Sequence, residues 1–312
     1  MTCLKYGFGL SVFLVGLLVA SKSVQGQAVP GVTEREILIG SCSALEGPSH
    51  FLGTETVTGA KAYLDMINDA GGVDGRKLRL ISYDDSYDPA KTEACFNRLM
   101  EQKVFALAFF VGTPTAVKYL PMAENQRQTA QVGGAIDTVK AAKPEAVVLV
   151  GPANTVAPIL KQSHAKGWKP LFLAVSFVGT DDLIQEAGPD AEGIVVTQVV
   201  PPYYLTEHKT VALYRRMLAK YYPSAQPNFV SLERFVDAMT LVEGLKRAGK
   251  ELTREGLIRG IESIHEFDTG LGSQLKLDYS AKDHKGFDHV IPTVVRGGRA
   301  VPFTDWSTVT SK

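Results

Sequence analysis

The chain has 312 residues, 45% of them hydrophobic, with 33 basic and 33 acidic side chains. A chain of this length can bury a sizeable core and is expected to fold as two domains. Because the formal net charge is zero and no basic stripe occurs, nucleic acid is not an expected partner.

The N-terminus resembles a secretory signal peptide. An apolar stretch at residues 9–20 follows a lysine, and the small residues at 24–26 suit a cleavage site. We therefore expect residues 1–26 to be removed and the mature protein to begin near Gln27 in the periplasm. The apolar stretch is short for a membrane span. Cys3 precedes that stretch, so a lipid anchor is not expected.

Strand and helix patterns alternate along the first third of the chain. Apolar periodicity predicts strands at 37–43, 78–83 and 104–111, and helices at 57–67, 90–102 and 116–124. Gly71 and Gly72 end the first helix, and Asp88 with Pro89 caps the second. Such a β-α-β-α-β-α order is typical of an α/β fold with a doubly wound sheet.

After Gln126 the rhythm changes, although strands and helices still alternate. The patterns predict helices at 135–142, 156–166, 181–187, 208–222, 230–248 and 254–263, and strands at 146–150, 171–175 and 194–200. Within 274–278 and 290–303 they predict short strands around polar turns. Pro201 and Pro202 stiffen the backbone, which suits a segment that crosses between domains.

The segment Val104 to Thr115 carries the strongest functional signal. Eight apolar residues run into Gly112, and the pattern makes Thr113 a helix N-cap and Pro114 the first helical residue. Free N–H groups at such a helix start favour an anion such as a carboxylate, and the threonine hydroxyls add donors. Capping alone is the alternative explanation of this loop.

Motifs for catalysis and cofactor binding do not occur. The sequence has no glycine-rich dinucleotide loop, P-loop lysine or Gly-x-Ser-x-Gly elbow, so we expect no cofactor and no enzymatic activity. The acidic residues Asp84, Asp85 and Asp88 lack the glycine and glutamate of a calcium loop, and a capped loop explains them better. A polar turn likewise explains His284 and His289 better than a metal site.

Two cysteines, Cys42 and Cys95, remain in the mature chain. They could pair in an oxidising compartment, but one follows a strand pattern and the other lies in a helix pattern. Since spacing cannot show that they meet, free buried thiols are the expectation.

The segments EGPSHFLGTETVTGAKAYLDMINDAGGVDGRKLRLISYDDSYDP and VGTPT resemble the periplasmic branched-chain amino-acid-type solute-binding proteins, and so do GIVVTQVVPPYY and FDTGLGSQLKLDYSAKDHKG. The resemblance covers nearly the whole mature chain. It implies two Rossmann-like lobes of the type I periplasmic binding fold, joined by hinge crossings, that close over a small amino-acid-like ligand. A membrane ABC permease would receive that ligand, and the protein is expected to be a monomer.

The resemblance also implies where the ligand binds. A first-lobe loop that holds the ligand carboxylate falls on Gly112, Thr113, Pro114 and Thr115. The expected walls of the pocket are Leu45, Leu52, Pro152, Ser176 and Phe177. Relatives that bind amino acids often have an aromatic residue and an acid where Pro152 and Ser176 stand, so a ligand ammonium loses its obvious partner here.

The resemblance assigns residues 27–126 and 201–288 to lobe 1, and residues 127–200 and 289–312 to an incomplete lobe 2. Relative to the family, on the order of 60–90 residues are missing after Gln126, since each βαβ unit needs about 30 residues. Three alternatives to a transport role remain open. They are a ligand-sensing or interaction protein on the same fold, an enzyme on a doubly wound sheet, and a shortened chain whose binding is impaired.

Overall fold

The computed structural model describes residues 29–112, 114–116 and 135–309. The predicted signal peptide, Thr113 and most of the helix predicted at 116–124 therefore lie outside the described residues. Among the helices within these ranges, none combines the length and the apolar composition that a bilayer crossing requires.

One part of the molecule is built on a parallel sheet with the strand order β2-β1-β3. The strands are β1 (Glu36–Ser43), β2 (Lys77–Asp84) and β3 (Ala106–Leu107). In the register, Ile37 of β1 lies opposite Leu78, and Ile39 lies opposite Ala106. The first two strands alternate with helices as the sequence predicts.

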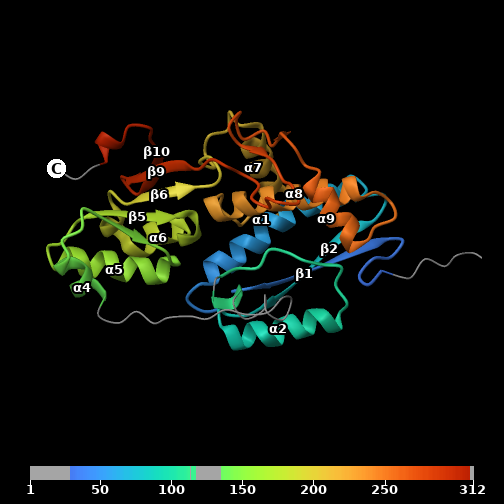
Figure 1. Ribbon diagram of the computed structural model, residues 1–312, viewed down its shortest axis with the longest axis horizontal. Coiled ribbons are helices and arrows are strands. Elements are labelled where there is room, and N and C mark those ends of the chain that lie inside the picture. The colour runs from blue at the N-terminus through green and yellow to red at the C-terminus, as the bar shows by residue number, and fades with distance from the viewer. Residues whose placement is uncertain (1–28, 113, 117–134, 310–312) are drawn as a thin grey trace, which may run out of the picture.

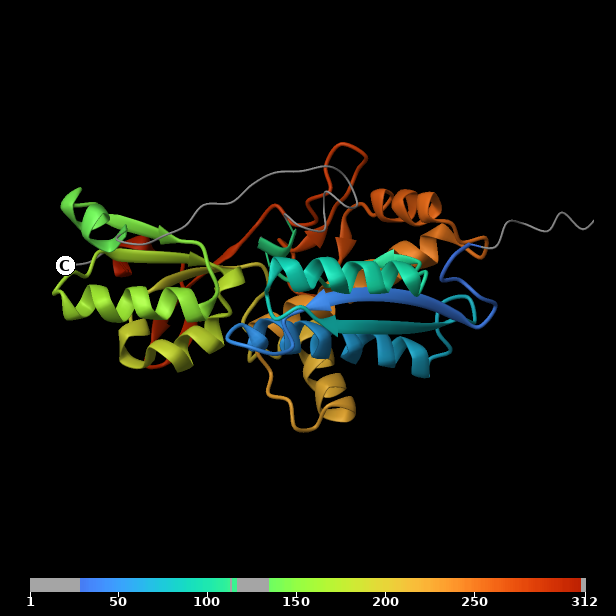
Figure 2. The same cartoon turned by 90° about the horizontal axis from the view of Figure 1, so that it is seen from below.

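Five helices surround this sheet, and with it they form what we call the three-stranded unit (Figures 1 and 2). They are α1 (His50–Asp69), α2 (Pro89–Glu101), α7 (Lys209–Tyr221), α8 (Phe229–Ala248) and α9 (Arg254–Glu262). Helices α1 and α2 lie on opposite faces of the sheet. The predicted cap of α2 is confirmed, since the Asp88 carboxylate accepts the N–H groups of Ala90 and Lys91 at 2.7 and 3.0 Å.

A second part, the five-stranded unit, has the strand order β10-β9-β6-β5-β4. Its strands are β4 (Ala146–Leu149), β5 (Leu171–Val175), β6 (Val195–Gln198), β9 (Ile291–Arg296) and β10 (Arg299–Pro302). Strands β4 to β6 are parallel, whereas β9 and β10 form an antiparallel hairpin. Its remaining elements are α4 (Ala135–Ala141), α5 (Ala153–Ala165), α6 (Thr180–Ala187) and the 3-10 turns η1 (Ser176–Val178), η2 (Gly188–Ala191) and η3 (Trp306–Thr308).

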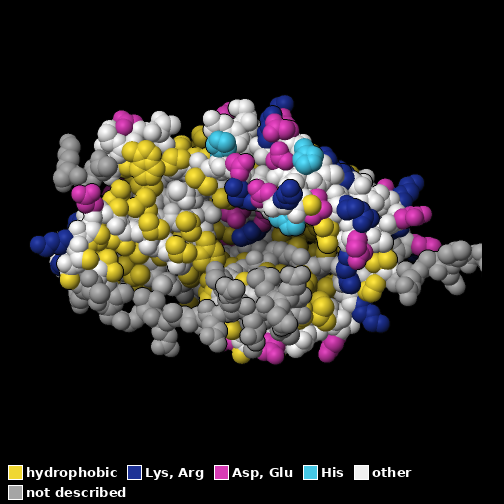
Figure 3. Space-filling view, in the orientation of Figure 1, with side chains coloured by type: hydrophobic (Ala, Val, Ile, Leu, Met, Phe, Trp, Pro, Cys, Tyr) yellow, Lys and Arg dark blue, Asp and Glu magenta, His cyan; other side chains and the backbone are white. Residues whose placement is uncertain are grey.

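Each unit has its own core. Helices α5 and α6 bury Leu160 and Leu183 against Phe172 and Ala174 of β5. The opposite face of this sheet carries many exposed apolar side chains (Figure 3), and Val148 on the edge strand β4 is 66% exposed. The chain crosses between the units after β6, through the buried Pro201 and Pro202, and again before β9. A short hairpin of β7 (Phe267–Asp268) and β8 (Lys276–Leu277) precedes that second crossing.

The strand predicted at 104–111 is much shorter than expected. Val104, Phe105, Phe109 and Val111 are buried, as the apolar run suggested, but only Ala106–Leu107 pairs with β1. The backbone of Phe109 has φ +61°, which is outside the strand region. The hydroxyls of Ser41 and Ser43 each donate to the Phe109 carbonyl at 2.9 Å. Side chains of β1 thus hold this segment in its non-strand path.

The expectation of free thiols at Cys42 and Cys95 is wrong, because the two residues form a disulfide. Cys42 lies near the end of β1 and Cys95 lies in α2, with their Cα atoms 6.1 Å apart. Both are buried among Leu38, Leu99 and Val104. The packing of α2 on the sheet brings the cysteines together, and sequence spacing does not encode that packing.

Candidate functional site

The carboxyl ends of the central strands of both sheets point toward the boundary between the two units. Figure 2 shows β1 and β2 directed at the five-stranded unit, and Figure 1 shows β5 and β6 directed back at the three-stranded unit. In open α/β sheets, ligands bind outside the carboxyl ends of the strands. The loops after these strands therefore make up the candidate site.

The loop after β1 is tied to the loop after β2 by one carboxylate. Asp84 Oδ1 accepts the N–H groups of Leu45 and Glu46 at 2.8 and 3.0 Å, and Asp84 Oδ2 accepts the Ser86 hydroxyl at 2.6 Å. Burial would raise the pKa of Asp84, but these hydrogen bonds outweigh it and hold the pKa below its usual value. The backbone of Leu45 is thereby fixed in the loop that follows β1.

The loop after β3 contains the predicted carboxylate-binding residues. Gly112 has φ +105°, and a Cβ there would lie 2.5 Å from the Tyr87 ring, so a larger residue would clash. Pro114 is half-buried and begins a helical turn, in which the Ala116 N–H donates to the Gly112 carbonyl at 2.9 Å. Thr113 lies outside the described residues.

Thr115 is fully buried, and its hydroxyl lies 2.6 Å from the Val111 carbonyl and 2.8 Å from that of Gly112. A hydroxyl has one proton to donate. The Thr115 hydroxyl therefore donates its proton to a carbonyl of its own loop. A contact between Thr115 and a ligand stays a prediction.

Two predicted residues from opposite units meet at the boundary. Phe177 of the five-stranded unit packs beside Leu52 of α1, Val111 and Val230 of α8, with Phe51 and Tyr87 around them. We call these six residues the interunit apolar cluster. The rings of Phe177 and Tyr87 are 6.5 Å apart. The predicted Pro152 does not belong to this cluster, and it occupies the N-cap position of α5 after β4.

Ser176 contacts a charged group that sequence reasoning missed. Its side chain lies close enough to Glu233 of α8 to lower the pKa of that carboxyl group, and Glu233 Oε1 lies 3.3 Å from Arg234 Nη2. Arg234 Nη1 donates to Asp237 Oδ2 at 2.6 Å, while its buried Nε–H has no partner among the described residues. We call Glu233, Arg234 and Asp237 the α8 charge triad.

Burial raises the pKa of Glu233, although Arg234 opposes the shift. Burial would lower the pKa of Arg234, but Glu233 and Asp237 outweigh it and raise that pKa. The Glu-Arg-x-x-Asp spacing puts residues 234 and 237 on one helix face. That signal is visible in the sequence, but a solvated helix face gives the same pattern. Glu233 of the triad supplies a carboxylate beside Ser176, the position after β5 where amino-acid-binding relatives often have an acidic residue.

The molecular surface is hollowed between the two units in the view of Figure 3, and both charged and apolar side chains border the hollow. Three further pockets, of about 330, 240 and 390 Å³, lie elsewhere. They are lined respectively by residues around Glu243, around His208 and around Lys61. None of these three contains a predicted site residue.

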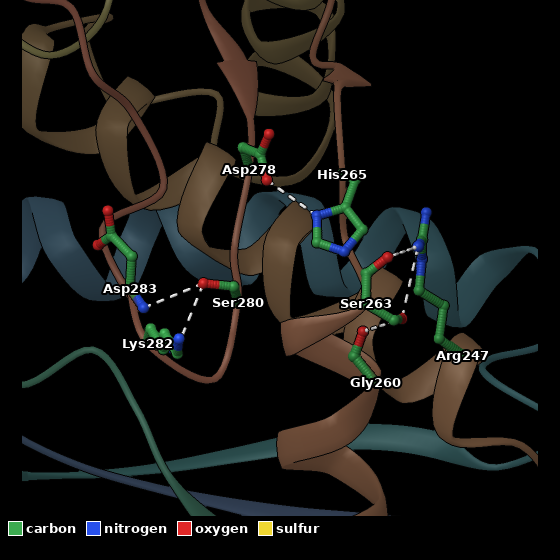
Figure 4. A network of polar contacts seen from close by, with 8 residues as sticks. All are labelled: Arg247, Gly260, Ser263, His265, Asp278, Ser280, Lys282 and Asp283. Atoms are coloured by element: carbon green, nitrogen blue, oxygen red, sulfur yellow. Dashed lines mark hydrogen bonds and ion pairs between the residues drawn. The ribbon is translucent and has the colours of Figure 1, made fainter.

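The region around Asp283 and His284 forms a polar turn, as the sequence predicts. The Ser280 hydroxyl accepts the N–H groups of Lys282 and Asp283, and a nearby His265–Asp278 pair is separated by 2.9 Å (Figure 4). His284 is paired with Glu262 of α9 at 2.9 Å. These contacts explain the polar residues of the turn by local structure.

Comparison with known proteins gives a consistent family. The model of a family described as periplasmic binding protein matches residues 36–132 and 126–299. A Leu/Ile/Val-binding protein of Citrobacter freundii is 26% identical over 167 residues, which cover 54% of this chain and 38% of that protein. The chain spans only 19–38% of the length of the curated Leu/Ile/Val-binding proteins of Escherichia coli K12 and Citrobacter freundii.

Solved structures share the fold at low sequence identity. A possible leucine/isoleucine/valine-binding protein from Rhodopirellula baltica has a TM-score of 0.77 and 24% identity, covering 91% of this chain and 100% of that one. A fatty acid ABC transporter substrate-binding protein from Thermomonospora curvata has a TM-score of 0.76 and 18% identity, covering 88% and 93%. The fold is that of type I periplasmic binding proteins, as predicted.

Proposed function

We propose, from the premise that this chain belongs to the periplasmic binding protein family, that it is the extracytoplasmic solute-binding component of an ABC importer. It binds an amino acid or a related small carboxylate or amide at the interunit boundary and delivers it to a membrane permease. The observation that carries this proposal is the convergence of strand-end loops from both sheets on one boundary, where Leu52 and Phe177 meet.

The two units correspond to the lobes of this proposal. Lobe 1 comprises residues 27–126 and 201–288, and lobe 2 comprises residues 127–200 and 289–312. The hydrophobic cores support the division, since Leu160 and Phe172 belong to one core and Ile37 and Phe235 to another, which also includes Ala300 of β10. Closure of two such lobes about their crossings would enclose a ligand.

Polar groups at the boundary favour a ligand with a carboxylate or an amide. The buried Nε–H of Arg234 has no acceptor within the described part of the chain, and Glu233 beside Ser176 adds an acceptor that could bind an ammonium or amide N–H. Leu52, Val111 and Phe177 offer apolar contact to the rest of a small solute. Gly112 and Pro114 would contribute the first-lobe contacts, with Leu45 and Pro152 at the margins.

An internal segment is missing after Gln126 relative to the family. The family match supports this proposal, because it falls into two segments that overlap at 126–132 instead of running through once. The short β3 at the edge of a three-stranded sheet is also consistent with lost neighbours. The alternative to full function is therefore a shortened chain with impaired binding.

Export to the periplasm as a monomer completes the proposal. The Cys42–Cys95 disulfide supports export, since such bonds form and persist in oxidising compartments.

A ligand panel read by thermal unfolding tests the proposal. We expect one of leucine, isoleucine, valine, their amides or short-chain carboxylates to raise Tm. A ligand at 100 times its Kd adds about 2.7 kcal/mol, which corresponds to about 5–10 °C for domains of this size. The control is the same panel on Phe177→Asp, which puts a charge into the interunit apolar cluster and should lose the shift.

A second protein distinguishes the alternatives. In it, the corresponding segment of the Citrobacter freundii relative is inserted after Gln126. A Tm rise in the extended protein alone would identify impaired binding in this chain, and no rise in either protein contradicts the proposed ligand class.

A further inference from the structure

A single carboxylate joins the two units beside the interunit apolar cluster. Asp181 is the second residue of α6, in the five-stranded unit. Its Oδ2 accepts the N–H of Phe229, the first residue of α8, at 3.1 Å, and its Oδ1 accepts the Tyr203 hydroxyl at 2.9 Å. The first N–H groups of a helix have no partner inside the helix. Asp181 therefore caps a helix that belongs to the other unit.

Apolar contacts surround this bond. Phe177, four residues before Asp181, lies in the interunit apolar cluster with Leu52 and Val230. At Gly179 the approach is closer still, since an added Cβ would lie 3.0 Å from Cδ2 of Leu52. The Tyr203 ring stacks edge-on against Phe229 at 5.3 Å. Polar and apolar contacts thus hold the same two surfaces together.

The side chains around Asp181 include acidic groups, so the N–H of Phe229 and the hydroxyl of Tyr203 are needed to offset the charge of its carboxylate. Glu55 of α1 and the adjacent Asp182 are acidic, while Tyr203, Tyr204 and Tyr214 are neutral, and Arg299 of β10 acts on the two tyrosines nearest to it. Burial raises the pKa of Asp181, and the Phe229 N–H and the Tyr203 hydroxyl counteract the rise. The two donors therefore offset part of the cost of burying the carboxylate, and separation of the units would remove them.

We propose that Asp181 is a positioning residue that keeps the two units in contact in the absence of ligand. With the Phe177 contacts, it makes a closed arrangement accessible before a ligand arrives. A ligand then selects a conformation that the free protein already populates. Asp181 acts through the Phe229 N–H and the Tyr203 hydroxyl, and it need not touch the ligand.

Distances between spin labels on the two units test this proposal on ligand-free protein. Labels are attached to Glu101→Cys in α2 and Lys161→Cys in α5, two exposed positions, in a chain that carries Cys3→Ser and keeps the native disulfide. In the parent protein we expect a dominant short-distance population. Asp181→Ala should lower the ratio of that population to longer distances by about tenfold, the size expected for a charged hydrogen bond.

Three further variants make the outcome decisive. Asp190→Ala removes a carboxylate that pairs with His164 inside the five-stranded unit, and it should leave the distances unchanged. Tyr203→Phe removes one donor and keeps the ring, so it should give a partial effect. Asp181→Asn keeps an acceptor oxygen and should also be partial, which preserves the test if Asp181→Ala fails to fold. Unchanged distances in Tyr203→Phe and in either Asp181 variant would overturn the proposal. Since no ligand is added, the result is independent of the proposed transport function.

Discussion

The carboxyl group of Asp182 is partly buried in the folded protein, and this burial is the main cause of its raised pKa. Burial, followed by repulsion from Glu186, raises its pKa to about 6, while His50 of α1 lowers the pKa and Asp181 raises it slightly. The folded protein therefore holds a proton on Asp182 more tightly than the unfolded chain does. The associated stability is present in full below the unfolded pKa, and it is lost as pH rises through the folded pKa.

The variant Asp182→Asn should accordingly raise Tm at pH 7.5, because the asparagine carries no charge to bury. Near pH 3.5, where the aspartate is mostly protonated in both states, we expect most of this difference in Tm to disappear. Thermal unfolding followed by circular dichroism at both pH values makes the comparison. Glu251→Gln, at an exposed position, is the control and should change Tm at neither pH. An equal gain at both pH values would contradict the explanation.

Residue-scale features governed by near neighbours in the sequence were predicted well. Asp88 caps α2 because its side chain reaches N–H groups only two and three residues away. The acidic partner of Ser176 was not predicted, since Glu233 is distant in sequence and reaches Ser176 only through the contact between η1 and α8. A contact between side chains can be predicted from the sequence when the two residues are close along the chain.

At the scale of elements, the crossing of α1 and α8 depends on one small residue. A Cβ at Gly59 of α1 would lie 2.0 Å from the Ser231 carbonyl oxygen of α8. The Tyr63 and Phe235 rings then meet edge to face at 4.9 Å near the same crossing. The helices can approach this closely only where a side chain is absent.

The variant Gly59→Ala should lower the free energy of unfolding by about 1–3 kcal/mol, because the new methyl group overpacks the crossing. In an exposed helix the same change would stabilise by about 0.5–1 kcal/mol, so the sign is informative. Urea unfolding measures it. The control is Gly151→Ala, whose Cβ would make ordinary contacts of 3.5 Å or more with Thr155 and Val156. A stabilised Gly59→Ala protein would show that the crossing is looser than described.

Many of the described elements lie close to their predicted bounds, but α1 and β3 differ clearly from the prediction, and β7 was not predicted. Helix α1 begins at His50, before the periodic apolar residues that indicated it. The strand predicted at 104–111 contributes only Ala106–Leu107 to the sheet. Apolar composition reports burial, which the structure confirms for Val104 and Val111. It does not report strand pairing, which here ends at Leu107.

At the scale of the whole molecule, the disulfide restrains the unfolded chain. Cys42 and Cys95 are 53 residues apart, and the bond joins β1 to the helix that covers it. Closing a loop of this length removes entropy from the unfolded state. The bond therefore contributes to stability through the entire first βαβα segment.

Reduction of this disulfide should lower the free energy of unfolding by about 2–4 kcal/mol. Chemical denaturation with and without reductant measures the change. The double variant Cys42→Ala, Cys95→Ala is the control, because reductant should not affect it, and its own stability separates the lost bond from lost packing. If reductant leaves the parent protein unchanged while thiol titration detects both cysteines, the stabilising role is refuted.

The sequence by itself determined the alternation of strands and helices, the caps, the buried apolar runs and the family resemblance, because each depends on neighbouring residues or on a continuous pattern. Only the tertiary structure decided the Cys42–Cys95 bond, the early end of β3, and the meeting of Phe177 and Asp181 with the three-stranded unit. Those features join segments distant along the chain. Their geometry is set by how the two units pack, and no local pattern carries that information.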